Sequence, residues 1–275
     1  MYVAIPKELN RLEPRVAATP GSVKQIIKSG LHVYVESGAG LKSFISDDAY
    51  QSSGATIIKS SKELLSNADI ILKVLPPSNE EIDLLKEKSV FVSLCQTTRE
   101  LETVRNLTNK KISAFSMHLI PRTTLAQKMD ALSSQANIAG YKAVLIAASR
   151  LGVYMPLLMT AAGTIRPSKV LILGAGVAGL QAIATAKRLG AQVEAFDVRP
   201  IVKEQVESLG AKFIEVKSES DDGVGEGGYA KETSDDYKQK QQQLIHEHIS
   251  KSDAVITTAL IPGRPAPILI PTTMV

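Results

Sequence analysis

The first feature with the residue types and spacing to do chemistry is a short run of three glycines. The run reads Gly174-Ala175-Gly176-Val177-Ala178-Gly179, after an apolar segment at 170–173. It predicts a strand, a tight turn and a helix. Gly174 permits the turn, Gly176 lets a phosphate approach the backbone, and Gly179 lets the helix pack close to the strand. Free amides and a positive partial charge at the helix N-terminus then favour a pyrophosphate.

An acidic residue after the next predicted strand, 192–196, points to a whole dinucleotide. Asp197 follows Gly174 by about 20 residues, the offset of an acid that binds the adenosine ribose. A carboxylate there also repels a 2′-phosphate, which favours NAD(H) over NADP(H). Arg199 leaves two interpretations open, since it either accommodates a 2′-phosphate or lies over the adenine or pairs with Asp197; we favour the second. The alternative for the whole motif is a strand–helix turn without a ligand.

A second polar cluster, within residues 121–137, directly precedes a predicted helix. A cation, an amide, a carboxylate and a hydroxyl come from Arg122, Gln127, Asp130 and Ser133. Such a set is able to orient a nicotinamide carboxamide and its ribose. Helix capping combined with surface charge is the alternative interpretation.

Composition limits the classes of protein. The chain has 275 residues, which favours two domains, and its net charge is +4 with 4% aromatic residues. Basic residues are scattered, whereas a nucleic-acid module clusters them or interleaves aromatics, so we expect no nucleic-acid partner. The single cysteine, Cys95, rules out an internal disulfide, fits a reducing compartment and is expected to be a small buried apolar residue. The four histidines do not converge on a metal site.

Two further segments concern membranes and targeting. The N-terminal residues lack the basic region and long apolar run of a signal peptide. Residues 143–163 are mostly apolar, but Arg150, Gly152 and Pro156 interrupt them. A charge at the middle of a span costs about 2.5–3.5 kcal/mol, so we expect a buried helix followed by a loop.

Alternating apolar and polar segments predict an α/β protein with two Rossmann-like doubly wound parallel-sheet domains, the second incomplete. The predicted strands are 3–6, 31–35, 55–58, 69–74 and 90–94 in the first domain, and 170–173, 192–196, 212–216 and 254–258 in the second. The domains are 1–133, a connecting helix and linker at 134–164, and a truncated NAD-binding domain at 165–275. The acidic, glycine-rich residues 218–228 predict a mobile loop.

Several long runs of this sequence resemble one family. They are RTTLAQKMDALSSQANIAGYKAV, TAAGTIRPSKVLILGAGVAGLQAIATAKRLGA, FDVRP, VKEQVESLGAKF, GGYAKE, ITTALIPGRPAP and IPKELNRLEPRVAATP. The chain closely resembles the NAD(H)-binding alpha subunits of proton-translocating NAD(P) transhydrogenases, in the alanine dehydrogenase/transhydrogenase family. The block RTTLAQKMDALSSQ is specific to the transhydrogenase branch.

The resemblance implies a set of contacts for NAD(H), position by position. They are, for the pyrophosphate, Gly174, Gly176, Val177, Ala178 and Gly179; for the adenosine ribose, Asp197, Val198 and Arg199; for the nicotinamide, Arg122, Gln127, Asp130 and Ser133; and for further contacts, Gly228, Tyr229, Gln241 and Leu260. In this family Tyr229 matches the tip of a mobile loop that closes over the nucleotide.

The resemblance also implies an activity and partners. The activity is direct hydride transfer between NAD(H) on this chain and NADP(H) on a partner component. Proton translocation is coupled to it by a membrane-spanning subunit. A homodimer and a cytoplasmic location, peripheral on the inner membrane through the partner subunits, are implied as well.

Two other functions stay open from the sequence. Alanine dehydrogenase uses an arginine and a lysine, matched by Arg15 and Lys73, and a histidine where Cys95 stands; its catalytic aspartate would lie beyond Val275. Amino-acid oxidation is therefore not expected, and we expect Arg15 and Lys73 to form ion pairs within the first domain. A non-catalytic NAD-binding remnant is the third alternative, because the chain ends before the second fold is complete.

Overall fold

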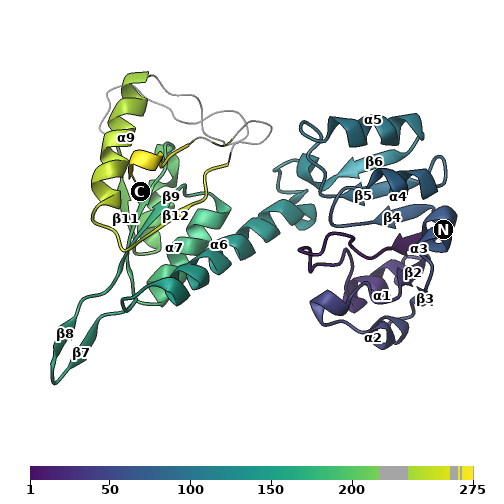
Figure 1. Cartoon of the computed structure of the whole chain (residues 1–275), viewed down its shortest axis with the longest axis horizontal. Helices are drawn as coiled ribbons and strands as arrows, with labels where there is room; N and C mark the ends of the chain where they lie inside the picture. The colour runs from purple at the N-terminus through teal and green to yellow at the C-terminus, as the bar shows by residue number, and fades with distance from the viewer. Residues whose placement is uncertain (217–234, 261–265, 267, 275) are drawn as a thin grey trace. The chain divides into compact units, whose positions relative to one another are not determined.

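The computed structural model describes residues 1–216, 235–260, 266 and 268–274. The chain divides into two compact units, Met1–Leu132 and Ser133–Val275. Figure 1 shows both units in the colours of their sequence positions. The predicted loop at 218–228, and with it Gly228 and Tyr229, lies outside the described residues.

Unit 1 is built on a six-stranded parallel sheet. Its strands are β1 (Tyr2–Ile5), β2 (His32–Glu36), β3 (Thr56–Ile58), β4 (Ile70–Leu72), β5 (Val90–Ser93) and β6 (Ser113–Ser116). Their order is β3-β2-β1-β4-β5-β6, so the chain reverses its direction of travel across the sheet between β1 and β4. This order is that of a complete doubly wound fold.

Helices cover both faces of this sheet (Figure 1). They are α1 (Pro20–Lys28), α2 (Asp47–Gln51), α3 (Ser61–Asn67), α4 (Asn79–Leu84) and α5 (Leu101–Asn109). Strand residues alternate between the faces, since Val3 and Ile5 pack with α1 and α2 whereas Ala4 packs with α3, α4 and α5. Buried apolar runs of this kind are typical of a parallel sheet.

Unit 2 contains a four-stranded parallel sheet. Its strands are β9 (Lys169–Leu173), β10 (Gln192–Phe196), β11 (Lys212–Ile214) and β12 (Ala254–Thr257), in the order β11-β10-β9-β12. One face packs against α6 (Ala131–Arg150), α7 (Val177–Arg188) and α8 (Lys203–Ser208). The other packs against α9 (Asp235–Ile249). The fold class and the four strands predicted for this part of the chain are confirmed.

Three elements differ from the expectations. The loop expected after the long helix contains an antiparallel hairpin, β7 (Leu158–Thr160) with β8 (Gly163–Ile165), seen at the end of unit 2 in Figure 1. In unit 1, α5 and β6 were not expected. β6 is an edge strand whose residues are mostly exposed, so it lacks the apolar run that identifies a buried strand.

None of the helices in the described part of the chain has the length and apolar character needed to span a membrane.

Candidate functional site

The glycine turn joins β9 to α7 at the carboxyl end of the sheet in unit 2. Gly174 has φ +100°, and its amide donates to the carbonyl of Phe196 at 2.8 Å. A Cβ on Gly179 would lie 1.8 Å from the carbonyl oxygen of Gly174. Glycine is therefore required at both positions, at the first by backbone conformation and at the second by close approach.

Gly176 faces open space. It precedes the first residue of α7, and no heavy atom of the described residues lies within 4 Å of where its Cβ would stand. The first turn of α7 carries amides that have no partner within the helix. An exposed backbone beside a helix N-terminus suits a phosphate group, so the residues at this turn fit the pyrophosphate of a dinucleotide.

Asp197 follows β10 and is hydrogen-bonded to the same turn. Its Oδ2 accepts from the amide of Ala175 at 2.7 Å, and both oxygens accept from the guanidinium of Arg199 at 2.9 Å. Burial raises the pKa of Asp197, but the hydrogen bonds from Arg199 and from two backbone amides outweigh burial and hold the pKa below its usual value. The expected pairing of Arg199 with Asp197 is confirmed.

Thr258 supports the turn from the neighbouring strand and was not among the predicted residues. Its hydroxyl donates to the carbonyl of Gly174 at 2.8 Å, and its amide donates to Leu173 at 2.8 Å. It directly follows β12, next to β9 in the sheet, so the turn lies where the strand order reverses. Open α/β sheets bind ligands at this reversal. A hydroxyl at the end of a predicted neighbouring strand was the available signal.

Helix α6 also contacts the turn. A Cβ on Gly140 would lie 2.0 Å from the carbonyl oxygen of Ala178, so the two helix backbones touch at the first turn of α7. One turn away, the amide of Asn137 donates to Oε1 of Gln181 at 3.0 Å. A glycine inside a helix costs about 1 kcal/mol relative to alanine, which was the signal for this contact in the sequence.

The four residues predicted for the nicotinamide lie close together in the chain. Gln127 begins a 3-10 turn, Gln127–Met129, and Asp130 follows it at the end of unit 1. Arg122 is exposed in the same unit, and Ser133 is in the first turn of α6 in unit 2. Of the further predicted contacts, Gln241 is buried on α9, and Leu260 follows Thr258 by two residues and is 58% exposed.

The corresponding edge of unit 1 is filled by buried charges. Lys73 follows β4, and its Nζ lies 2.6 Å from Glu81 and 3.8 Å from Glu8. Glu8 also accepts from the amide of Val74 at 2.6 Å, while its Oε2 has no hydrogen-bond partner among the described residues. Burial raises the pKa of Glu8, although Lys73 opposes the shift. These contacts confirm the expectation that Lys73 forms ion pairs within the first domain.

Arg15 and Cys95 do not complete an amino-acid dehydrogenase site in unit 1. Arg15 forms an ion pair with Glu13 at 2.7 Å. Cys95 is buried, and burial together with a hydrogen bond to Glu100 raises the pKa of its thiol to about 12. The thiol is therefore protonated at neutral pH and is a poor proton acceptor.

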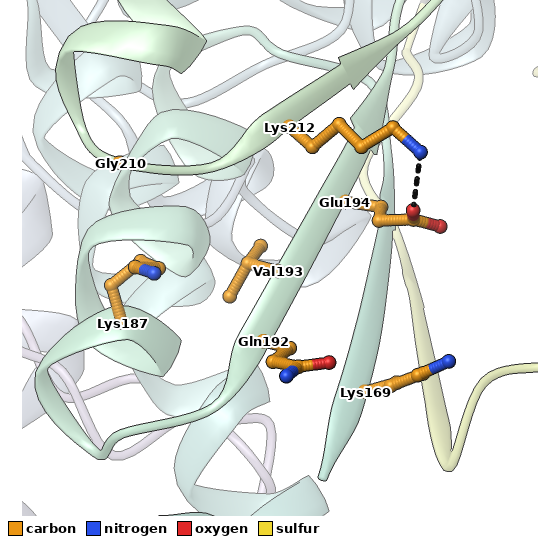
Figure 2. Close-up of a pocket in the computed structure, with 7 residues that line it drawn as sticks. All are labelled: Lys169, Lys187, Gln192, Val193, Glu194, Gly210 and Lys212. Carbon is orange, nitrogen blue, oxygen red and sulfur yellow. Dashed lines mark hydrogen bonds and ion pairs between the residues drawn. The ribbon is translucent and has the colours of Figure 1, made fainter. Parts of the chain in front are cut away.

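A cavity of about 300 Å³ lies at the opposite edge of the sheet in unit 2. Figure 2 shows its lining: Lys169, Lys187, Gln192, Val193, Glu194, Gly210 and Lys212. Lys169, Gln192 and Lys212 are the first residues of their strands, so this cavity is at the amino ends of the strands and not at the glycine turn. Across residues 1–216 and 235–260, no three His, Cys, Asp or Glu side chains gather as metal ligands do.

The fold and the turn define a dinucleotide-binding unit of the doubly wound class. The chain matches the N-terminal domain of the alanine dehydrogenase/PNT family over residues 4–139 and its C-terminal domain over residues 143–275. The chain belongs to the alanine dehydrogenase/PNT family, an oxidoreductase family, and the resemblance noted from the sequence is confirmed.

Individual relatives carry transhydrogenase names. The chain is 48% identical to the first portion of NAD(P) transhydrogenase subunit alpha of Rhodospirillum rubrum, covering 100% of this chain and 73% of that protein. It is 46% identical to NAD(P) transhydrogenase subunit alpha of Haemophilus influenzae, covering 100% of this chain and 53% of that protein. The solved transhydrogenase of Sinorhizobium meliloti superposes with a TM-score of 0.87 at 45% identity, over 100% of this chain and 74% of the other.

Proposed function

We propose that this chain is the NAD(H)-binding component of a proton-translocating NAD(P) transhydrogenase. Family membership supports the proposal, as do the transhydrogenase names of relatives that are 45% to 48% identical over the whole chain. The observation that carries it is the open backbone at Gly176, which lies between the first turn of α7 and the Ala175 amide that donates to Asp197.

The residues of unit 2 hold the adenosine half of the cofactor in this proposal. Gly174, Gly176 and Gly179, with Val177 and Ala178 between them, bring backbone amides to the pyrophosphate. Asp197 accepts hydrogen bonds from the adenosine ribose, and Val198 and Arg199 border it. Gln241 and Leu260, together with Gly228 and Tyr229 outside the described residues, supply further nucleotide contacts.

The nicotinamide is oriented by Gln127, Arg122, Asp130 and Ser133. When bound, its ring donates or accepts a hydride at C4. The side chains of this chain need not donate a proton; their work is to fix the ring, with Gln127 holding the carboxamide and the other three forming a hydrogen-bond network. Positioning of reactants alone lowers a barrier by up to roughly 7–11 kcal/mol.

The second nucleotide and the coupling come from partners. NADP(H) is held by a separate component, and a membrane-spanning subunit couples hydride transfer to proton translocation. We further propose that the chain forms a homodimer and is attached peripherally to the inner membrane on its cytoplasmic side through these subunits. Division of the chain into residues 1–133, 134–164 and 165–275 remains our proposal for its domains.

Direct titration with NADH tests the cofactor assignment. The variant Gly176→Ala adds a methyl group where nothing in the described structure contacts it, so the fold is expected to be unchanged while NADH binding weakens at least about tenfold, or roughly 1.4 kcal/mol. Gly152→Ala is the matched control, since its Cβ also meets nothing within 4 Å. Equal affinities for both variants and the unaltered chain would contradict the assignment.

The transfer reaction is tested by mixing the purified chain with an NADP(H)-binding component of the family. Reduction of an NAD analogue by NADPH is then followed, and the expected result is transfer that requires both proteins. Transfer from NADPH in the absence of the second component, or alanine-dependent formation of NADH by this chain alone, would overturn the proposal.

A further inference from the structure

The Asp197 carboxylate has all its acceptor positions filled. Its Oδ1 accepts from the backbone amide and from Nε of Arg199, both at 2.9 Å. Its Oδ2 accepts from the amide of Ala175 at 2.7 Å and from Nη2 of Arg199 at 2.9 Å. A carboxylate offers about four lone-pair positions, so a further donor must displace one of these. The side chains of Asp197 and Arg199 are 7% and 16% exposed.

The guanidinium of Arg199 is the donor that can leave. The amides of Ala175 and Arg199 belong to the main chain, and the first is fixed by the glycine turn. Nε and Nη2 instead occupy one position on each carboxylate oxygen, and rotation of the side chain releases both together. Two positions, one on each oxygen, are what two ribose hydroxyls require.

We propose that Arg199 is a specificity-determining residue that competes with the adenosine ribose for Asp197. NAD(H) must displace the guanidinium before its ribose hydroxyls bind the carboxylate. The displaced cation then lies beside the ribose, where it weakens the exclusion of a 2′-phosphate. The inference rests on the proposed function, because it assumes that unit 2 binds NAD(H).

Charge determines the sign of both effects. Asp197 without a partner places a full negative charge beside the 2′ position and repels a phosphate. A guanidinium neutralises this charge and can itself bind phosphate with two parallel hydrogen bonds. Removal of the guanidinium should therefore strengthen NADH binding and weaken NADPH binding. A merely structural role for Arg199 would shift the two affinities in the same direction.

Three variants of the full chain separate these roles. Arg199→Met removes the guanidinium but keeps an unbranched apolar stem, whereas Arg199→Lys keeps the charge and loses the two-pronged pairing. Arg166→Met is the matched control, because Arg166 forms the same two-pronged pair with Asp253, at 2.9 and 3.0 Å, near the amino ends of the strands. Dissociation constants for NADH and NADPH are measured by nucleotide fluorescence, and folding is checked by circular dichroism.

The expected result is a change in opposite directions. Arg199→Met binds NADH more tightly and NADPH more weakly, so that the ratio of the two constants rises at least about tenfold. Arg199→Lys binds NADH more tightly and keeps the NADPH affinity of the unaltered chain, which serves as the test if the methionine variant does not fold. Arg166→Met changes neither constant.

Other outcomes overturn the inference. They are an NADH affinity that is unchanged or weaker in both Arg199 variants, or parallel changes for the two nucleotides. Absence of NADH binding by the unaltered, folded chain would instead overturn the proposed function itself, so the two failures are distinguishable.

Discussion

Replacement of Gly140 by alanine should destabilise unit 2, although alanine is the better helix former. In an exposed helix the change would stabilise the protein by about 1 kcal/mol. Here the new Cβ would lie 2.0 Å from the carbonyl oxygen and 2.8 Å from the carbonyl carbon of Ala178. Close carbon–oxygen contacts between helices are about 3.3–3.6 Å, so α6 and α7 must separate by more than about 1 Å.

The magnitude follows from what must move. The obstructing atoms are backbone atoms of the first turn of α7, which cannot rotate away as a flexible side chain does. Overpacking of this kind costs about 1–3 kcal/mol, and the backbone contact places Gly140→Ala at the upper end. After subtraction of the propensity gain, we expect a loss of about 2 kcal/mol, which lowers the Tm by about 5 °C.

Denaturant unfolding and NADH titration measure the two consequences. A displaced first turn of α7 misplaces the amides that face the pyrophosphate, so NADH affinity should fall together with stability. Gly152→Ala, which meets nothing within 4 Å, should change stability by no more than about 0.5 kcal/mol. If Gly140→Ala is as stable as Gly152→Ala and binds NADH equally well, the contact between α6 and α7 has no role in the site.

Three further predictions concern charge and chemistry. Lys73→Met leaves Glu8 and Glu81 buried without their cation and should cost about 3–5 kcal/mol at neutral pH in urea unfolding; the loss should shrink as falling pH protonates the glutamates. Asp197 has a lowered pKa, so it stabilises the fold above the usual Asp value of about 3.9 and loses this effect as the pH falls through its lower folded value; Asp197→Asn should flatten that acid limb of the stability curve and weaken NADH binding. Gln127→Asn should lower the rate of hydride transfer more than NADH affinity, and equal losses in transfer and binding would show that Gln127 does not orient the ring.

The elements that the sequence predicted correctly are those with strong local patterns. The segment 170–173 and the glycine run specify a strand, a turn and a helix through nearest-neighbour chemistry, and the structure has them at these positions. Asp197 was identified because the length of one strand–helix–strand unit is nearly constant. Its saturation by Arg199 was suggested as a pairing, but the count of filled acceptor positions required coordinates.

The features that the sequence did not predict depend on packing over long distances in the chain. Gly140 and Thr258 contact the turn from elements that lie far from it in sequence, and neither belongs to a local motif. β6 lies at the sheet edge with exposed side chains, and α5 begins at Glu100 without a side-chain cap. Weak burial and a missing cap remove the two signals on which sequence-based assignment depends.

The two units show how similar sheets are suited to different tasks. In both, the strand order reverses beside the first strand, which is where doubly wound sheets bind ligands. In unit 2 the first strand is followed by the glycine turn and its open backbone. In unit 1 it is followed by Pro6, which has no amide hydrogen, and by Glu8, whose carboxylate reaches the end of β4 at Val74.

The chemistry at these two reversals explains why the cofactor is assigned to unit 2. A pyrophosphate needs several free amides and an absence of negative charge. Glu8 and Glu81 place two buried carboxylates around the single Lys73 in unit 1, and their side chains occupy the space that glycines leave open in unit 2. Introduction of a glycine turn after β1 would therefore not create a nucleotide site, because the buried carboxylates would still repel the phosphates.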